Sequence, residues 1–114
     1  MIYQRDLVLI SFPFSNLQES KVRPVIVMSN DQYNKKFADF IAVPLTSNMK
    51  LRYHTIVITT QELESGKLIV DSQAKVDKIF AVEQSLIRKK IGTVKKAVHE
   101  SLKRMLVVLR FACE

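Results

Sequence analysis

The stretch Lys21-Val22-Arg23-Pro24-Val25-Ile26-Val27-Met28 decides the fold that we expect for this chain. Its last four residues are all apolar, which is typical of a short strand that is buried on both faces. A strand of that kind lies in the interior of a sheet, so the stretch predicts the central strand of a β-barrel. Lys21 and Arg23 stand just before the buried residues, so two cations are expected at the rim of this element.

Further strands are predicted on either side of this stretch. Leu7 to Ile10 is a short apolar run, and Pro13 ends it because proline has no backbone donor for the next ladder bond. The polar residues 15–21 are predicted to form a loop, and Ser65-Gly66 a turn. Additional extended segments are expected at 40–45, with Pro44 at an edge or a bulge, at 55–60, where every residue is β-branched, at 67–70, and within 72–82.

Two helical segments are expected as well. The side chains of residues 29–31 can cap a short helical turn that continues to about Phe37. From Thr93 onward, apolar residues recur at intervals of three and four, which predicts an amphipathic helix with Thr93 as its N-cap. Glu100 precedes Arg104 by four residues, the favourable order for an ion pair on a helix surface. The apolar stripe of this helix should pack on the barrel.

The length and composition fit one globular domain. A chain of 114 residues with 47% hydrophobic residues can bury a core without a disulfide or a structural metal, so we expect a single domain over residues 1–114. The expected class is α+β, mostly β: a compact barrel with a C-terminal helix. Cys113 is the one cysteine, and the chain shows neither a secretory signal nor an apolar run of about 20 residues, so a cytoplasmic protein with no membrane contact is expected.

The charge balance points to polyanionic partners. Lys and Arg number 18 against 11 Asp and Glu, so the surface should attract nucleic acid by long-range steering. The alternative is that the lysines only keep a small domain soluble. Charge alone leaves both interpretations open.

Most of the common catalytic patterns are missing from the sequence. His54 and His99 lie far apart and Cys113 is near the end, so no metal-ligand spacing is present. Gly66 and Gly92 are the only two glycines and cannot form a phosphate-binding loop. We therefore expect no metal and no cofactor, which leaves metal-free chemistry or simple binding.

Three short segments carry the remaining candidates. The planar fork of Arg23 can hold two phosphate oxygens, although a surface ion pair is the alternative. The segment 46–48 offers small hydrogen-bonding residues for a phosphate or a base edge, and is equally typical of a turn. Lys75 and Asp77 are two residues apart, so on a strand they would share one face as an acid and a base, or as a solvated ion pair.

In this order, the segments resemble the MazF/PemK family of toxin endoribonucleases, which are related in fold to the gyrase poison CcdB. The match spans nearly the whole chain, and order and spacing make it more specific than each motif alone. The matching segments are Asp6-Leu7-Val8-Leu9, Lys21 to Val27 with the following Ser29-Asn30-Asp31, Val43-Pro44-Leu45-Thr46-Ser47, Asp71-Ser72 through Asp77-Lys78-Ile79, and Ile87 to Ile91 with the terminal helix.

The resemblance implies an SH3-like barrel that dimerises, cuts single-stranded RNA at short sequences without a metal, and is silenced by a small antitoxin. It places Arg23 and Thr46 at catalytic positions, and Lys75 and Asp77 where some members have an Arg and an Asp that act as acid and base. We expect the following residues to bind RNA: Lys21, Ser47, Asn48, Lys50, Arg52 and Lys78.

The chain departs from the family pattern at several positions. Arg5 replaces the glycine of an opening Gly-Asp pair, and Phe80 occupies a position that often holds arginine. Lys75 keeps a cation in place of Arg but loses the bidentate geometry. Several members have a histidine near the first loop or just before the arginine, whereas this chain has Val22 there and no histidine in 12–21. A mechanism that depends on such a histidine is therefore not expected.

The hypothesis that follows is transesterification, in which the 2′-hydroxyl of RNA attacks the adjacent phosphate. Arg23 would hold the phosphate oxygens, Thr46 would position the 2′-hydroxyl, and Asp77 would accept its proton.

Two alternatives remain open at this point. The first is a barrel that binds nucleic acid or a protein target without catalysis, as CcdB does, with Phe12, Phe14, Tyr33 and Phe80 as stacking platforms. The second is a surface used chiefly for assembly with an acidic antitoxin. In the enzyme interpretation, loops 12–21 and 49–54 would set the RNA recognition sequence.

Overall fold

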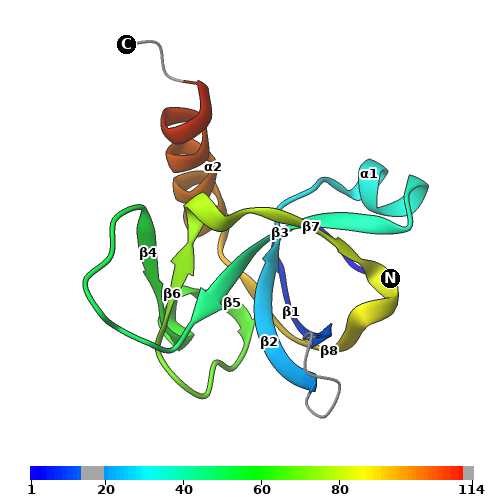
Figure 1. Ribbon diagram of the computed structural model, residues 1–114, viewed down its shortest axis with the longest axis horizontal. Coiled ribbons are helices and arrows are strands. Elements are labelled where there is room, and N and C mark those ends of the chain that lie inside the picture. The colour runs from blue at the N-terminus through cyan, green and yellow to red at the C-terminus, as the bar shows by residue number, and fades with distance from the viewer. Residues whose placement is uncertain (14–19, 112–114) are drawn as a thin grey trace.

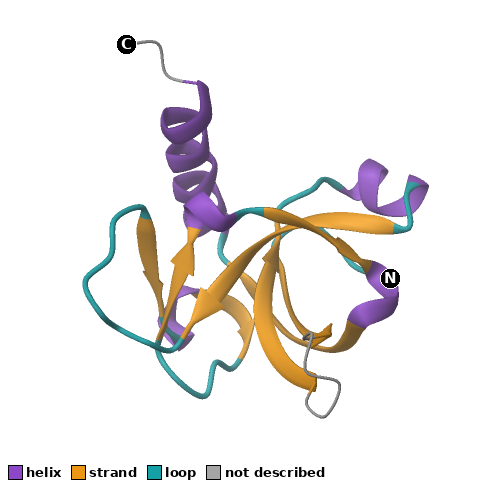
Figure 2. Cartoon of the chain, viewed as in Figure 1, coloured by secondary structure: helices purple, strands orange, loops and turns teal. Residues whose placement is uncertain are grey.

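The computed structural model describes residues 1–13 and 20–111. Within these ranges the chain forms one sheet, two α-helices and three single turns of 3-10 helix (Figure 2). The helices are α1 (Asp31–Lys36) and α2 (Lys96–Phe111), and the 3-10 turns are η1 (Thr60–Glu62), η2 (Val76–Lys78) and η3 (Gln84–Leu86). The strands are β1 (Asp6–Pro13), β2 (Ser20–Val27), β3 (Asp39–Thr46), β4 (Thr55–Ile58), β5 (Leu63–Gly66), β6 (Ser72–Lys75), β7 (Phe80–Glu83) and β8 (Ile87–Val94).

The sheet is strongly curled, and all strand pairs among the described residues are antiparallel. Its strand order is β4-β6-β3-β2-β1-β8-β5, and β7 pairs with β3 beside this path. Because β7 continues through η3 into β8, and β8 pairs with β1, the strands β1, β2, β3, β7 and β8 surround a common interior (Figure 1). β2 is the middle strand of the path, as the four consecutive apolar residues predicted. The expected mostly-β barrel with a C-terminal helix is confirmed.

Two hydrophobic clusters lie on the two faces of strands β1, β2 and β3. Alternate residues point to opposite faces of a strand, so Leu7 belongs to one cluster and Val8 to the other. The inner cluster, inside the barrel, comprises Ile2, Val8, Ile10, Val25, Val27, Phe40, Ala42 and Val82. The outer cluster contains Leu102 of α2, which is fully buried, together with Leu7, Ile26, Met28, Val43, Leu45, Ile58, Leu63, Ala74, Val76 and Val94.

Strand β3 changes its partner along its length, and Pro44 lies at the change. Residues 39–42 of β3 pair with β7, and residues 45–46 pair with β6. Pro44 falls between these two segments, so its missing N–H interrupts neither ladder. The expectation of an edge or a bulge was therefore wrong, because β3 is an interior strand with a gap between two partners.

Three predictions for residues 55–82 need correction. The strand expected over 55–60 ends at Ile58, because Thr59 caps η1 by accepting from the backbone N–H of Gln61. Ser65-Gly66 ends strand β5 rather than forming a turn, and residues 67–70 are not a strand. The strand expected within 72–82 is present as β6, and η2 separates it from β7.

The predicted start of the C-terminal helix was two to three residues too early. Thr93 lies in β8, and its hydroxyl donates to the Asp6 carboxylate at 3.3 Å, so it does not cap α2, which begins at Lys96. The ion-pair partner of Glu100 is Lys103, with Nζ 3.1 Å from Oε1, rather than Arg104. The lysine hydrogen bond lowers the pKa of Glu100. The short helix at residues 31–37 was predicted correctly, and Asn30 caps it by accepting from the N–H of Tyr33 at 2.8 Å.

The predicted polar loop 15–21 can be compared with the structure only at its end. Lys21 lies inside β2, which begins at Ser20, so the strand starts before the expected position. The rest of that segment, together with Phe14 and Cys113, lies outside the described residues.

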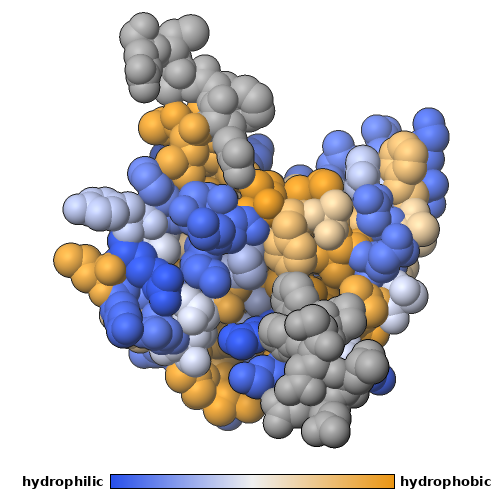
Figure 3. Space-filling model, in the orientation of Figure 1, coloured by the Kyte–Doolittle hydropathy of each residue, from blue (hydrophilic) through white to orange (hydrophobic). Residues whose placement is uncertain are grey.

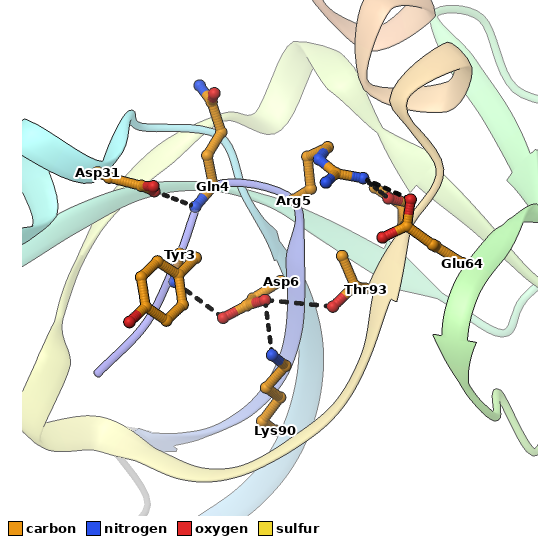
Figure 4. A network of polar contacts seen from close by, with 9 residues as sticks. Tyr3, Gln4, Arg5, Asp6, Asp31, Glu64, Lys90 and Thr93 are labelled. Carbon is orange, nitrogen blue, oxygen red and sulfur yellow. Dashed lines mark hydrogen bonds and ion pairs between the residues drawn. The ribbon is translucent and has the colours of Figure 1, made fainter.

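Arg5 occupies the position where the family pattern has glycine, and its backbone φ of 78° lies in the left-handed region. Its guanidinium donates to the carbonyl oxygen of Val94 at 2.8 Å and pairs with Glu64 at 3.5 Å (Figure 4). The side chain thus clamps the start of β1 to the end of β8 and to β5. These contacts offset a backbone conformation that costs about 1–2 kcal/mol for a residue with a Cβ.

The next residue, Asp6, is a buried carboxylate with a full set of donors. It is 1% exposed and accepts hydrogen bonds from the backbone N–H of Tyr3 at 2.8 Å and from Thr93 (Figure 4). Lys90 Nζ lies 3.0 Å from its Oδ1. A buried charge is tolerated when it is paired and hydrogen-bonded in this way, and Asp6 therefore fixes the N-terminal turn against β8.

Candidate functional site

Arg23 and Thr46 project from the same face of neighbouring strands. The paired register of β2 and β3 ends at Val25 and Pro44, and its continuation by two residues in each strand would bring Arg23 and Thr46 to opposed positions. Side chains two residues apart in a strand share a face, so both residues lie on the face that carries Val25. Directly opposed residues of an antiparallel pair have Cβ atoms about 4.5–5.5 Å apart. In such an arrangement the guanidinium of Arg23 and the hydroxyl of Thr46 would both reach one small group.

The same face continues across two more strands. Thr46 pairs with Gln73 of β6, and Gln73 pairs with Val57 of β4. Lys75 follows Gln73 by two residues and so lies on this face, diagonal to Thr46 at a typical separation of about 7–8 Å. A guanidinium, a hydroxyl and an ammonium group thus follow one another across the sheet, and we call Arg23, Thr46 and Lys75 the cross-strand row.

The local geometry of Thr46 leaves its proton available. The side chain is half-buried, and Oγ1 accepts a hydrogen bond from the backbone N–H of Asn48 at 3.2 Å. Asn48 Oδ1 in turn accepts from the N–H of Lys50 at 3.1 Å. Because the threonine oxygen is the acceptor in the first of these bonds, its O–H can donate to a ligand. The segment 46–48 therefore forms a turn and also leaves the hydroxyl of Thr46 able to donate to a ligand.

A cavity of about 470 Å³ opens between β2, the end of β3 and the segment 67–72. Apolar side chains from β1, β2, β3 and β8 line it, and cations stand among them. Three of the predicted residues, Lys21, Arg23 and Ser47, contribute to its lining. The exposed Ile69 and Val70 lie on the facing segment. This cavity can take a ligand that is anionic on one side and apolar on the other.

A second pocket, of about 430 Å³, lies beside β4 and contains most of the other predicted residues. Figure 3 shows hydrophilic side chains gathered over the part of the molecule that carries β3, β4 and β6. We call this the loop-side pocket, and its lining is Arg52, Tyr53, His54, Thr55, Lys75, Asp77 and Lys78. Lys75 belongs to this pocket and to the cross-strand row, so the two regions adjoin.

Lys75 and Asp77 come together differently from the prediction. β6 ends at Lys75, and Asp77 lies in η2, so the two side chains do not share a strand face. Both nevertheless line the loop-side pocket. Lys78 Nζ lies 3.9 Å from Asp77 Oδ2, a long contact between partly exposed groups. The predicted shared strand face of Lys75 and Asp77 was therefore wrong, and the cation that contacts Asp77 here is Lys78.

Gln73 holds the loop that carries several predicted residues, and sequence analysis missed it. Its side chain is 5% exposed, and Nε2 donates to the carbonyl oxygens of Asn48 at 3.0 Å and Lys50 at 2.9 Å. Its Oε1 accepts from the hydroxyl of Thr55 at 2.7 Å. A glutamine between a serine and an alanine shows no sequence signal of burial. Lys50 itself lines neither pocket.

The aromatic candidates are mostly occupied elsewhere. The Tyr33 hydroxyl donates to Asp39 at 2.9 Å, which raises the pKa of Tyr33, and its ring lies 4.6 Å from that of Phe37 beside α1. Phe80 is half-buried and packs on the inner cluster. Phe14 and the side chain of Phe12 lie outside the described part of the chain. Tyr53, which was not among the predicted aromatic residues, is by contrast strongly exposed.

Within residues 1–13 and 20–111, His, Cys, Asp and Glu side chains form no group of three or more that could hold a metal ion. Neither helix in the described part of the chain has the length and apolarity needed to cross a membrane.

The fold is that of the MazF toxins. The Mycobacterium tuberculosis toxin MazF-mt6 superimposes with a TM-score of 0.72 at 14% identity, over 90% of this chain and 93% of that chain. A mycobacterial endoribonuclease in complex with its cognate antitoxin superimposes with a TM-score of 0.77 at 16% sequence identity, over the full length of both chains. The MazE–MazF complex from Deinococcus radiodurans contains a chain that superimposes with a TM-score of 0.78 at 20% sequence identity, over 95% of this chain and 94% of that chain. No curated protein sequence matches significantly.

The family follows from the sequence match. The model of the PemK-like, MazF-like toxins of type II toxin–antitoxin systems matches residues 3–109. The chain therefore belongs to this family, as the resemblance of its ordered segments indicated.

Proposed function

We propose that this chain is the toxin of a type II toxin–antitoxin pair and a metal-independent endoribonuclease that cuts single-stranded RNA at specific short sequences. The observation that supports the proposal is the cross-strand row, in which Arg23, Thr46 and Lys75 lie on the same face of neighbouring strands. The family and the endoribonucleases among the similar folds support the same activity.

The proposed reaction is transesterification within the RNA. The 2′-oxygen forms a bond to the adjacent phosphorus, and the bond from phosphorus to the 5′-oxygen breaks, which leaves a 2′,3′-cyclic phosphate and a free 5′-hydroxyl. Arg23 holds two phosphate oxygens and stabilises the charge that develops on them. Thr46 donates a hydrogen bond that orients the reacting group. RNA itself supplies the nucleophile.

Two proton transfers complete the reaction. Asp77 accepts the proton of the 2′-hydroxyl, and Lys75 delivers one to the departing 5′-oxygen. Both residues line the loop-side pocket, which adjoins the row through Lys75. The remaining predicted RNA contacts are Lys21, Ser47, Asn48, Lys50, Arg52 and Lys78. DNA lacks the 2′-hydroxyl and should stay intact.

The direct test is cleavage of single-stranded RNA in excess chelator. The wild type should produce discrete cuts, and Arg23→Ala should cut about 100- to 1000-fold more slowly, as expected for loss of a positioned electrostatic group. Arg88→Ala is the matched control, because Arg88 is also exposed and lines neither pocket. If Arg23→Ala cuts at the wild-type rate, the role of Arg23 is wrong. RNA that is shifted in a gel but never cut would favour the non-catalytic binding barrel.

Substitutions at Thr46 test the second member of the row. Thr46→Val keeps the shape and removes the hydroxyl, whereas Thr46→Ser keeps the hydroxyl. We expect the valine variant to be impaired and the serine variant to retain most activity. Equal rates in the two variants would exclude a role for the hydroxyl.

The proposed partners are single-stranded RNA, a cognate antitoxin and a second copy of the chain, in the cytoplasm and without a cofactor. MazE–MazF complexes among the similar structures support an antitoxin partner. The formal net charge of +7 suits an acidic antitoxin segment. Light scattering after size-exclusion chromatography would measure the oligomeric state, and a monomer at micromolar concentration would contradict the homodimer.

A further inference from the structure

The loop between β3 and β4 alternates apolar and basic residues without burying the apolar ones. In order, residues 49–54 are Met, Lys, Leu, Arg, Tyr and His. Met49 is 47% exposed, Leu51 is fully exposed and Tyr53 is 89% exposed. Such alternation in a strand normally places apolar side chains on a core. Here they face solvent between cations, which is a surface suited to a ligand with both apolar and anionic parts.

Among Met49, Leu51 and Tyr53, it is Tyr53 that stands in a defined pocket. It lines the loop-side pocket with Arg52 and His54 on its own loop and with Lys75 and Lys78 on the facing segment. Its ring lies 6.2 Å from the ring of His54, at an angle of 47°. The pocket is therefore walled by an aromatic surface and by basic side chains from two separate segments.

The backbone of the loop fixes this aromatic residue in place. His54 has a φ of 63°, a left-handed conformation that a residue with a side chain rarely adopts. Its carbonyl oxygen accepts a hydrogen bond from the N–H of Val76 at 3.1 Å. Gln73 bonds the loop at two earlier carbonyls, as described above. Strained backbone that the surroundings hold in place is concentrated at functional sites.

We propose that the loop-side pocket binds the nucleotide next to the scissile phosphate, with its base stacked on Tyr53 and its phosphate held by Arg52 and Lys78. This inference rests on the proposed function, because the cross-strand row defines where the scissile phosphate lies. Lys75 belongs to both regions, so a strand bound at Arg23 and Thr46 reaches the pocket at the adjoining nucleotide. Tyr53 is then a binding residue rather than a catalytic one.

Stacking explains why an aromatic side chain is kept in water at this position. Every base has a π-face, so a tyrosine ring can hold any of them, and cations beside it neutralise the phosphate. Removal of a stacking residue typically costs about 1–3 kcal/mol per base, which corresponds to about 5- to 150-fold in affinity. Tyr53 is expected to contribute affinity without selecting one base.

The experiment measures binding and cutting separately. The cut positions of a transcript are first mapped with the wild type in excess chelator, and a fluorescent oligonucleotide that spans one of them is made with every 2′-hydroxyl methylated, so that it cannot be cut. Tyr53→Ala should bind it about 5- to 150-fold more weakly, and Tyr53→Phe should bind it within about twofold of the wild type, because phenylalanine keeps the stacking face.

The control is Tyr3→Ala, which truncates a tyrosine that is 47% exposed, on a segment that lines neither pocket. It should leave binding unchanged, and melting curves should show that Tyr53→Ala is as stable as the wild type. If the wild type cuts RNA and Tyr53→Ala binds like the wild type, this inference is overturned while the proposed function stands. If the wild type cuts nothing, the proposed function itself fails. Tyr53→Phe binding as weakly as Tyr53→Ala would also overturn stacking.

Discussion

Replacement of Gln73 by methionine is expected to release the loop 47–54 while the barrel stays folded. The methionine side chain is unbranched and of similar length, so the buried space stays filled, but it cannot donate to Asn48 or Lys50 or accept well from Thr55. The wild-type amide makes these three hydrogen bonds at 3.0, 2.9 and 2.7 Å. The two bonds to backbone carbonyls are the ones that hold the loop.

The magnitude follows from these two bonds. A hydrogen bond contributes about 0.5–1.5 kcal/mol net, so the loop should lose about 1–3 kcal/mol of docking free energy. Asn48 and Lys50 are exposed, so their carbonyl oxygens can turn to water when the loop opens, and no further penalty for an unpaired buried group applies. The population of open loop should therefore rise about 5- to 150-fold.

Limited proteolysis with trypsin measures this population directly. Lys50 and Arg52 both lie in the loop, and cleavage after either residue tracks the open population when opening and closing are fast. The control is Thr55→Val, which removes the third hydrogen bond of Gln73 and keeps the two that hold the loop. Mass spectrometry should show faster cutting at both sites in Gln73→Met alone. Equal rates in the two variants would refute the role assigned to Gln73.

Three further predictions concern stability. Arg5→Gly should be about 1 kcal/mol more stable than Arg5→Ala in urea unfolding. Both variants lose the same side-chain contacts, and only alanine keeps the strain at φ 78°. The reverse order of stability would contradict that strain. Gly66→Ala should lower the free energy of unfolding by at least about 2 kcal/mol, since a Cβ there would lie 2.1 Å from the Ile91 carbonyl oxygen at a φ of +85°. An unchanged melting temperature would contradict this prediction. Burial lowers the pKa of His99, with Lys103 adding to the effect. Below the ordinary histidine pKa of about 6.5, His99 is therefore more protonated in the unfolded chain than in the folded one. Stability should therefore be full above that pH and fall as the pH is lowered toward the folded pKa, by at most about 1.4 kcal/mol per pH unit, and His99→Gln should remove this dependence.

The elements that were predicted correctly have their signal within a few neighbouring residues. Val25 to Met28 are buried because four consecutive apolar residues leave no polar face for solvent. Asn30 caps α1 because its side chain reaches the free N–H groups of the following turn. Thr93 failed as a cap because Asp6, far away in sequence, bonds its hydroxyl. The residues 67–70 are apolar enough for a strand but line a cavity instead.

The site shows the same division between local and long-range information. Arg23 and Thr46 were predicted to converge. They lie on the same face of neighbouring strands, but the paired register ends two residues before them, so their convergence and their chemical roles stay predictions. The relation of Lys75 to Asp77 was misjudged, because the change from strand to 3-10 turn after Lys75 has no clear sequence signal. Gln73 could not be found, since its importance depends on a loop about 25 residues upstream. The alternation in 49–54 was the one readable signal for Tyr53.

The two clusters on opposite faces of β1, β2 and β3 have a consequence for how the molecule melts. The same three strands form a wall of each cluster, so neither cluster can come apart while the other keeps its full set of contacts. Backbone amides of these shared strands should exchange with deuterium only through global unfolding, whereas those of the loop 47–54 should exchange through local opening. The proposed RNA site therefore joins a wall that opens only on global unfolding to a loop that opens on its own.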